Sequence, residues 1–358
     1  MKFLFVVQGE GRGHMTQAIS LSAILRNSGH EVVAVMLGKS ERRETPEFFV
    51  NKVGAKVTAF QSPNFLVDSK NKKIHIGTTI VYNTLKLRTF IKSMKLINKT
   101  VKETKPDVII NFYDLLAGLY MMVYNPKVKY VCVGHQYLLR HKQFEFPKGH
   151  AMDKFLLNLM TTFASMRASK FLALSFRSMP DEPKSKIYVV PPLLRPEIKE
   201  LEIKNEGFIH GYMLNSGYAE DIERWHNEHK SIVLHFFWDK KDAPEELKVN
   251  DNLTFHRIND QKFLDYMRRS AGYSSTAGFE SICEAMYLGK PIMMVPTYGH
   301  FEQLCNAHDG VLSGAGIHCE HFDLSALLNY IPKHNDITVQ FRAWADSSAN
   351  KFLKLLTE

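Results

Sequence analysis

The stretch from Ser274 to Ala307 constrains the fold of this chain more than any other. Small and hydroxyl-bearing residues, Ser274 to Gly278, precede an amphipathic run from Phe279 to Leu288. Gly289 ends that run, and the proline two residues later prevents it from continuing. The pattern predicts a helix with small residues at its start. An apolar strand, Ile292 to Val295, follows it.

The start of this predicted helix is a candidate phosphate site. Its backbone N–H groups and the positive end of its dipole favour a phosphate or diphosphate. Ser275 or Thr276 can cap the helix or add a hydroxyl contact. Glu284 lies six residues after Gly278, which is about 9 Å along the axis at about 1.5 Å per residue. A carboxylate there can accept hydrogen bonds from a ribose diol while the helix start holds the phosphates.

A polar loop follows the apolar strand. It carries His300, Glu302 and Gln303. We expect these side chains to lie beside the same helix start, where the sugar of a nucleotide sugar would project.

The order of these residues resembles the donor site of GT-B glycosyltransferases. It is most similar to the lipid-linked N-acetylglucosaminyltransferase of peptidoglycan synthesis and its relatives. The resemblance rests on the small residues before Gly278, Glu284, Gly289-Lys290-Pro291, Pro296, Glu302-Gln303 and Asn306-Ala307. It implies that Glu284 holds the nucleotide ribose and that Glu302 and Gln303 contact the donor sugar. The alternative is an ordinary βαβ unit in which the Gly and Pro residues only end the elements.

A second glycine-rich turn lies near the start of the chain. A strand ending near Val7 leads into Gln8 to His14, and a helix from about Thr16 to Ser28 follows. The spacing G-x-G-x-G departs from the dinucleotide pattern GxGxxG, and no acidic residue ends the next strand, which argues against a nicotinamide enzyme. The turn resembles the first loop of the same glycosyltransferases, which implies acceptor contacts at Gly11 and Gly13.

His14 is the candidate general base for activating an acceptor hydroxyl. An imidazole at the mouth of a glycine-rich loop can titrate near neutral pH, and the resemblance supports this role. Asp114, at the end of a predicted strand, could orient His14; alternatively it caps the helix that begins at Leu115. His135 and Gln136 are acceptor-facing by analogy, with a satisfied pair at a strand end as the equal alternative.

The resemblance extends to the nucleotide. It implies that the diphosphate contacts the turn at Ser216 and Gly217 and that the backbone of Ile258 touches the base. This chain has Asn215-Ser216-Gly217 where relatives carry two or more glycines, which weakens the first expectation. No Asp-x-Asp motif occurs, so we expect neither a metal nor another cofactor. The expected donor-binding residues are Ser216, Gly217, Ile258, Ser275, Thr276, Ala277, Gly278, Glu284, His300, Glu302 and Gln303.

Charge is divided unevenly along the chain. Residues 1–196 carry 30 Lys and Arg against 13 Asp and Glu, a net charge of +17, whereas residues 197–358 carry 16 against 24, a net charge of −8. The basic half predicts an anionic partner. Nothing resembles a nucleic-acid-binding module, which favours a membrane surface. We expect a cytoplasmic protein, peripheral on the inner face of the membrane, with four free thiols.

One predicted helix carries much of this positive charge. Between about Ile80 and Glu103, apolar residues recur on one face and basic residues on another, at spacings of four and three. Such a stripe lies against anionic lipid in some proteins and is simply the solvated face of a packed helix in others. The basic residues are Arg88, Lys92, Lys95, Lys99 and Lys102.

The alternation of strands and helices predicts two doubly wound, Rossmann-like α/β domains of the GT-B type facing a central cleft. Residues 1–196 form the expected acceptor domain, and a proline-rich linker, Pro191 to Pro196, ends it. Residues 197–338 form the expected donor domain, with strands at Gly207 to Leu214, Ile232 to Phe237 and Leu253 to His256. Residues 339–358 form a helix expected to pack back across the boundary.

The predicted function is therefore inverting, metal-independent transfer of a sugar, most readily from a UDP-sugar, to a hydroxyl of a lipid-linked or cell-envelope glycan. Two alternatives stay open. A UDP-sugar 2-epimerase shares this architecture but needs no acceptor surface, which the basic half argues against. A sugar-nucleotide-binding protein without catalysis is the other.

Overall fold

The computed structural model describes residues 1–40, 45–63, 86–213, 216–240 and 242–358. The chain divides into two compact units. The first unit comprises residues 1–144, 148–195 and 344–358, and the second comprises residues 145–147 and 196–343.

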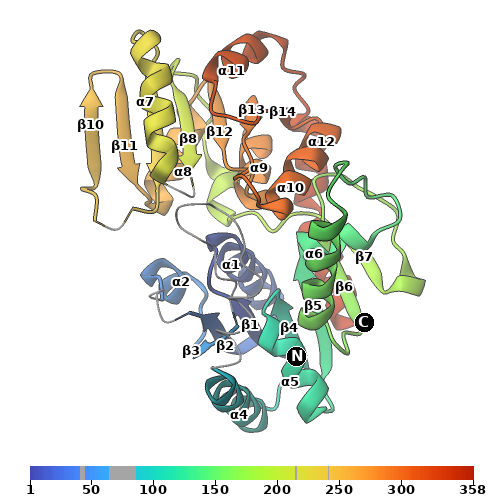
Figure 1. The fold of residues 1–358 in the computed structure, drawn as a ribbon. Coiled ribbons are helices and arrows are strands. Elements are labelled where there is room, and N and C mark those ends of the chain that lie inside the picture. Colours follow the sequence, from blue (N-terminus) through green and yellow to red (C-terminus); the bar gives the residue numbers. More distant parts are fainter. Residues whose placement is uncertain (41–44, 64–85, 214–215, 241) are drawn as a thin grey trace. The chain divides into compact units, whose positions relative to one another are not determined.

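The first unit is built on a parallel sheet with strand order β3-β2-β1-β4-β5-β6-β7 (Figure 1). The strands are β1 Lys2–Gln8, β2 Glu31–Lys39, β3 Val57–Gln61, β4 Val108–Phe112, β5 Lys129–Gly134, β6 Lys170–Leu174 and β7 Ile187–Val190. Central strands are buried along their length, as in β4. This burial explains their continuous apolar sequence, because helices cover both faces of a parallel sheet.

The helices of the first unit begin near the positions that the sequence predicts. Helix α1 starts at Arg12 rather than near Thr16, with Gly11 as its N-terminal cap residue. The basic helix is described from Leu87, so the part of the prediction before Lys86 lies outside the described residues. The helices are α1 Arg12–Asn27, α2 Glu47–Lys52, α4 Leu87–Thr104, α5 Leu115–Tyr124, η1 His135–Arg140, α6 Ala151–Ala164, η2 Pro183–Ser185 and α13 Ser348–Thr357.

The C-terminal residues 344–358 belong to the first unit. The Trp344 indole N–H donates to the Ser175 carbonyl at 3.0 Å. Lys170 donates from its ammonium to the Leu355 carbonyl at 2.6 Å, which fixes α13 beside β6. Helix α12, Thr338–Asp346, links the second unit to this segment. The single helix expected over residues 339–358 is therefore two helices, α12 and α13, separated by a turn at Ser347.

The second unit has a sheet with order β10-β11-β9-β8-β12-β13-β14. Its described strand pairs are parallel except β10 with β11. The strands are β8 Ile209–Met213, β9 Leu234–Trp238, β10 Glu246–Asn250, β11 Leu253–Arg257, β12 Gly272–Ser275, β13 Ile292–Met294 and β14 Gly316–His318. The helices are η3 Pro196–Glu200, η4 Ser216–Tyr218, α7 Ala219–Glu228, α8 Asp260–Arg269, α9 Phe279–Tyr287, α10 Phe301–Leu312, α11 Leu324–Tyr330 and η5 Ile331–Lys333.

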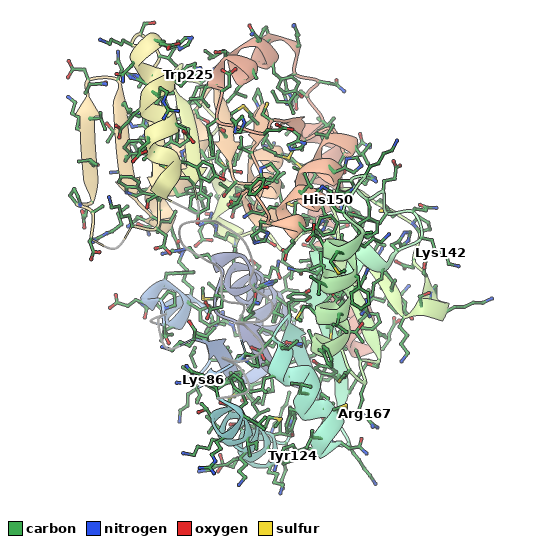
Figure 2. The ribbon with its side chains drawn as sticks, viewed as in Figure 1. Lys86, Tyr124, Lys142, His150, Arg167 and Trp225 are labelled. Carbon is green, nitrogen blue, oxygen red and sulfur yellow. The ribbon has the colours of Figure 1, made fainter. Side chains whose placement is uncertain are left out.

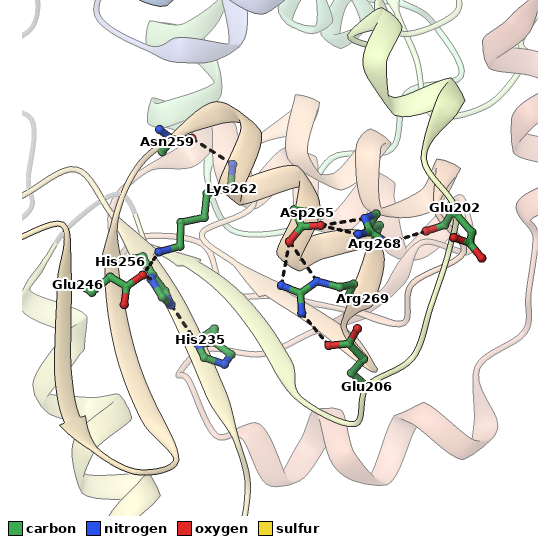
Figure 3. Close-up of polar contacts among 10 residues, drawn as sticks. All are labelled: Glu202, Glu206, His235, Glu246, His256, Asn259, Lys262, Asp265, Arg268 and Arg269. Atoms are coloured by element: carbon green, nitrogen blue, oxygen red, sulfur yellow. Dashed lines mark hydrogen bonds and ion pairs between the residues drawn. The ribbon is translucent and has the colours of Figure 1, made fainter.

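The segment of the second unit that precedes β8 is fixed to the end of α8 (Figure 3). The amide of Glu206 donates to the Arg269 carbonyl at 2.8 Å, and the Arg269 guanidinium pairs with the Glu206 carboxylate at 2.7 Å. Arg268 donates to the Glu202 carbonyl at 3.2 Å. Asp265 binds both arginines, so the guanidinium groups are held in place for these contacts.

Both sheets change direction at a central strand. Strand β1 has β2 on one side and β4 on the other, and β8 has β9 and β12. In doubly wound sheets, ligands bind outside the carboxyl ends of the strands beside such a switch point. The loops after β1 and β4, and those after β8 and β12, are therefore the candidate ligand-binding segments.

Candidate functional site

His14 lies in the first turn of α1, just past the end of β1. Its Nδ1 is 3.2 Å from the side-chain oxygen of Gln17, and its Nε2 is 3.4 Å from the amide nitrogen of Gln136. An amide oxygen only accepts and an amide NH₂ only donates. The contacts therefore select the neutral tautomer with hydrogen on Nδ1 and the lone pair on Nε2. That lone pair can accept a proton.

Gln17 is a residue that the sequence analysis missed. It follows His14 by three residues on α1, so the two side chains share one face of the helix. This i, i+3 spacing was the available signal. The ring of His14 also stacks on Tyr113, with centroids 5.8 Å apart.

Asp114 does not orient His14. It is the N-terminal cap residue of α5, and its Oδ1 accepts from the amides of Leu116 at 2.9 Å and Ala117 at 3.1 Å. The relay from Asp114 to His14 that the sequence suggested is therefore wrong in its geometry, and the capping alternative describes this carboxylate. The physical reason is that α5 begins directly after Asp114, so its free amides lie closest to the carboxylate.

The Asp114 carboxylate is fully buried. Burial raises the pKa of Asp114 to about 6, although the Ser62 hydroxyl and the two amides of α5 act to lower it. The preceding residue, Tyr113, has a positive φ of 62°, a strained conformation for an aromatic residue. Its hydroxyl is fixed 2.8 Å from that of Thr161 on α6.

A small cavity of about 30 Å³, partly open to solvent, lies at this edge of the first sheet. Polar groups of Gln8, Glu10 and Asp114 share it with the apolar side chains of Leu115 and Met160. The remaining lining residues are Gly38, Ser62, Pro63, Tyr113 and Ala164. The cavity places hydrogen-bond acceptors beside an apolar wall, with room for about one water molecule.

Of the other residues expected to bind the acceptor, some lie near His14 and one bonds to a strand carbonyl. Gly11 precedes α1 and Gly13 lies in its first turn. His135 is buried, and its Nδ1 donates to the Leu174 carbonyl at 2.8 Å. This contact fits the alternative interpretation, in which His135 is a hydrogen-bonded residue at the end of a strand and does not face the acceptor. Gln136, the next residue of η1, instead contacts His14.

In the second unit, hydrogen bonds to three other segments of the chain fix the loop from Ser275 to Gly278. The Thr276 amide donates to the Tyr212 carbonyl of β8 at 3.3 Å, and the Ser275 carbonyl accepts from Val295 at 2.8 Å. Ala277 has a φ of +55°, and its carbonyl accepts from the Asn306 amide at 3.0 Å. A left-handed alanine costs roughly 1–2 kcal/mol, so these contacts maintain a strained turn.

This turn delivers the chain into α9. Gly278 is its N-terminal cap residue, in extended conformation and without a side-chain cap. The buried hydroxyl of Ser275 has no hydrogen-bond partner among the described residues. The first turn of α9 therefore keeps the features of an anion site, namely backbone amides, a dipole and a nearby hydroxyl. Asn306, which the sequence pattern included without a role, positions this turn.

Glu284 lies on α9 and is 2% exposed. Burial raises the pKa of Tyr273, and the negative charge of Glu284 raises it further.

The polar loop after β13 is ordered by its own side chains. His300 caps α10 by accepting from the Gln303 amide at 3.3 Å. The side-chain oxygen of Gln303 accepts from the Thr297 amide at 2.8 Å, so its NH₂ group is the end left to donate. Glu302 is half-buried beside it.

The nucleotide-side candidates follow two other strands of this sheet. Ser216 and Gly217 lie in η4 after β8, and both are exposed. The Ile258 amide, after β11, donates to the Trp238 carbonyl at 3.0 Å. The expected donor residues other than Glu284 thus lie at the carboxyl ends of strands in one sheet or in the segments that follow them. Among the described residues, no cluster of three His, Cys, Asp or Glu side chains could hold a metal ion.

Comparison with known proteins agrees with this architecture. A family model described as glycosyl transferase family 1 matches residues 1–333. An uncharacterized glycosyltransferase of Methanosarcina acetivorans is 24% identical over 341 residues, covering 86% of this chain and 82% of that protein. A counterpart of Methanosarcina mazei is also 24% identical, with the same coverage.

Solved structures share the fold at low identity. The glycotransferase of kitacinnamycin has a TM-score of 0.65 at 16% identity, covering 99% of this chain and 98% of its own. UGT2 of Phytolacca americana, complexed with UDP-2fluoro-glucose and pterostilbene, has a TM-score of 0.63 at 13% identity and the same coverage. The spinosyn rhamnosyltransferase SpnG, complexed with thymidine diphosphate, has a TM-score of 0.60 at 12% identity over all of both chains. The expected fold class, two Rossmann-like α/β domains of the GT-B type, is confirmed.

Proposed function

Since the chain belongs to glycosyl transferase family 1 and is a glycosyltransferase, we propose that it transfers a sugar from a UDP-sugar, with inversion and without a metal. The proposed acceptor is a hydroxyl of a lipid-linked or cell-envelope glycan, met at the inner face of the cytoplasmic membrane. Among the described residues, no helix is both long and apolar enough to cross a bilayer.

One observation supports the donor assignment: the strained turn at Ala277, held by Asn306, leads into a helix start that has no side-chain cap. We propose that the diphosphate binds there, that Glu284 accepts from the ribose hydroxyls, and that Glu302 and Gln303 bind the sugar. Ser216, Gly217 and the Ile258 backbone complete the nucleotide contacts. Strain of this kind persists where the surrounding structure enforces it, often at ligand sites.

The proposed transfer step is a single displacement at the anomeric carbon of the sugar. The acceptor hydroxyl oxygen attacks the anomeric carbon from the face opposite the diphosphate, and the bond from that carbon to the phosphate oxygen breaks. Its electron pair leaves with the nucleoside diphosphate, whose charge the amides of α9 stabilise. The hydroxyl proton passes to Nε2 of His14, the lone pair that Gln17 selects by binding Nδ1.

A thermal-shift comparison tests the donor. UDP, thymidine diphosphate and their sugars are added to the full chain, and the largest shift is expected from UDP or a UDP-sugar. Glu284→Ala should abolish most of it. Glu302→Ala is the matched control, since it should keep the shift due to UDP and lose only the increment due to the sugar.

Two results would count against the proposal. The first is the absence of a shift with any nucleotide. The second is an unchanged UDP shift in Glu284→Ala. Product analysis by proton NMR then gives the anomeric configuration, which should be opposite to that of the donor, and EDTA should leave turnover unchanged. Release of UDP that does not depend on an acceptor, together with an epimerised sugar, would instead identify an epimerase.

A further inference from the structure

The Nε2 atom of His14, the proposed proton acceptor, is already hydrogen-bonded in this structure. The side-chain amide of Gln136 donates to it at 3.4 Å, and Gln17 binds Nδ1 on the other side of the ring. All three side chains are buried, with exposed fractions of 9% for His14, 4% for Gln136 and 3% for Gln17. An acceptor hydroxyl that gives its proton to Nε2 must therefore take the place of the Gln136 amide.

The position of Gln136 follows from the end of β5. Gly134 is the last residue of β5, and η1 begins directly after it. A Cβ at position 134 would lie 2.6 Å from the side-chain oxygen of Gln136, so the absence of a side chain at Gly134 leaves the room in which this amide lies. His135 anchors the same turn, since its Nδ1 donates to the Leu174 carbonyl of β6. The backbone of the turn is therefore fixed beside His14.

Gln136 can leave this contact more readily than His14 can. The His14 ring lies on α1 and stacks on Tyr113 with centroids 5.8 Å apart, and the Tyr113 hydroxyl lies 2.8 Å from that of Thr161. Gln136 instead reaches Nε2 through a long side chain with several rotatable bonds. The 3.4 Å contact is longer than the roughly 2.7–3.2 Å of a typical hydrogen bond, so a hydroxyl that approaches more closely can replace it.

We propose that the Gln136 amide covers Nε2 of His14 until an acceptor hydroxyl displaces it. This role rests on the function proposed above, and it makes Gln136 a positioning residue that acts through His14. Before the acceptor binds, the amide keeps water from using the lone pair of Nε2. The bound sugar nucleotide is thereby protected from hydrolysis, and the base becomes available when the acceptor hydroxyl arrives.

The reaction that the covered base suppresses is displacement by water. The water oxygen attacks the anomeric carbon, the bond from that carbon to the phosphate oxygen breaks, and its electron pair leaves with the nucleoside diphosphate. One water proton passes to Nε2 of His14. Water and an acceptor hydroxyl use the same lone pair, so a partner that only the more firmly bound hydroxyl displaces favours transfer over hydrolysis.

Two other roles of Gln136 lead to different expectations. A purely structural role, in which the amide only satisfies a buried histidine, predicts lower stability in Gln136→Leu and no gain in reactivity at His14. Direct binding of the acceptor, which the sequence suggested, predicts slower transfer with unchanged hydrolysis. The contact with Nε2 favours the covering role, because it places the amide on the atom at which the acceptor hydroxyl would bind.

Chemical modification tests this role without any sugar donor. Diethyl pyrocarbonate acylates the unprotonated nitrogen of a neutral imidazole, and in His14 that nitrogen is Nε2 because Nδ1 carries the hydrogen that binds Gln17. Gln136→Leu nearly keeps the size of the side chain and removes the donor. The modification rate of His14 at neutral pH, measured by mass spectrometry of its peptide, should rise about threefold to tenfold.

A second variant and a matched control accompany this measurement. Gln136→Met also lacks the donor and adapts to the same space, so it should raise the rate as Gln136→Leu does. The control is Gln143→Leu, which should react like the wild-type chain. Gln143 is exposed and follows Lys142, which lies at the edge of the first unit in Figure 2. Melting temperatures check that each variant is folded.

Hydrolysis of a donor tests the consequence for the reaction. UDP-glucose and UDP-N-acetylglucosamine are incubated with the full chain in the absence of an acceptor, and the released UDP is measured. Gln136→Leu should release UDP about threefold to tenfold faster than the wild-type chain. Combining it with His14→Ala should remove the gain.

The outcomes separate this role from the proposed function. An unchanged modification rate in both Gln136→Leu and Gln136→Met would overturn the covering role, whatever the donor. Faster hydrolysis that persists in the double variant with His14→Ala would overturn it as well, since the gain would then not pass through the base. If modification of His14 rises but no variant hydrolyses either sugar nucleotide, the covering role stands and the proposed donor is wrong.

Discussion

Gly38 lies directly against the carboxylate of Asp114, in a space where no β-carbon can be placed. A Cβ at position 38 would collide with Oδ2 of Asp114 and would approach the ring of Phe60 to 2.9 Å. Gly38 is on β2 and Asp114 follows β4, so the contact crosses the end of β1. The glycine at the end of β2 therefore allows a buried carboxylate at the switch point of the first sheet.

Substitution of this glycine should be destabilising. Gly38→Ala forces Asp114 to move, which weakens the cap of α5 and overpacks the sheet edge, at a total cost of about 2–3 kcal/mol. The melting temperature measures this loss. Gly11→Ala is the control, because a Cβ there meets no atom within 4 Å; its cost should stay below about 0.5 kcal/mol. Equal melting temperatures for the two variants would contradict the packing argument.

If Gln17 orients His14, two substitutions of Gln17 should affect activity differently. Gln17→Ala removes the acceptor of Nδ1–H, and kcat should fall roughly tenfold to a hundredfold because the productive tautomer is no longer selected. Gln17→Glu keeps an acceptor there and should restore most of the activity. Its carboxylate stabilises the imidazolium, so the acid limb of the pH profile should move to higher pH. If both variants lost activity equally with an unmoved profile, Gln17 would have only a structural role.

Three histidines packed together in the second unit predict acid sensitivity. His235 Nδ1 and His256 Nε2 are 3.0 Å apart, and Lys262 and Glu246 lie beside them (Figure 3). The ring of Tyr266 packs against both histidines, with centroids 4.7 and 4.9 Å away, and the charge of Arg269 acts on His235. Burial lowers the pKa of His235 to about 4, helped by the charge of Arg269, and burial lowers the pKa of His256 to about 3, helped by Lys262. The buried, neutral ring of His210 lies in the same group, and its pKa is also lowered by burial.

These shifts fix the direction of the pH effect. Between an unfolded pKa near 6.5 and the folded values, the unfolded chain binds more protons, so stability falls as pH decreases from about 6.5 to 4. Melting temperatures across this range should show the loss. His256→Phe should flatten the curve, whereas substitution of the exposed His321 by Gln should leave it unchanged. A curve that keeps its slope in His256→Phe would assign the acid sensitivity to other groups.

Lys290 predicts a stability effect at alkaline pH. It is buried, and its ammonium donates to the Lys204 and Ser270 carbonyls, both at 2.8 Å. Lys290→Met leaves both carbonyls without this donor and should cost about 2–4 kcal/mol. The exposed Lys333, changed to Met, is the control and should cost less than about 0.5 kcal/mol.

The pKa of Lys290 gives a second measurement on the same variant. Burial lowers this pKa to about 8, so the unfolded chain binds more protons between about pH 8 and 10.5, and stability from this group rises with pH there. Lys290→Met should remove that rise. If the wild-type chain and the variant show the same alkaline pH dependence, this lysine does not carry the effect.

Helices and strands whose apolar residues follow one clear pattern could be predicted from the sequence. The apolar run of β4 and the amphipathic run of α9 are local patterns. A strand buried on both faces has consecutive apolar residues, and a helix buried along one stripe has apolar residues at helical spacing. Strand β10 was missed. All five of its residues are exposed at the edge of the sheet, so burial imposes no pattern on Glu246 to Asn250.

The sequence by itself determined the α/β class, the helix start after Gly278 and the basic face of α4, because each depends on residues close together in the chain. Only the tertiary structure decided which groups meet. In the folded chain the Asp114 carboxylate caps α5, Gln17 hydrogen-bonds to His14, and Asn306 donates to the carbonyl of Ala277, 29 residues away in sequence. A side chain bonds to whichever partner the packed backbone brings within about 3 Å, and that proximity is a property of the assembled sheet rather than of spacing along the chain.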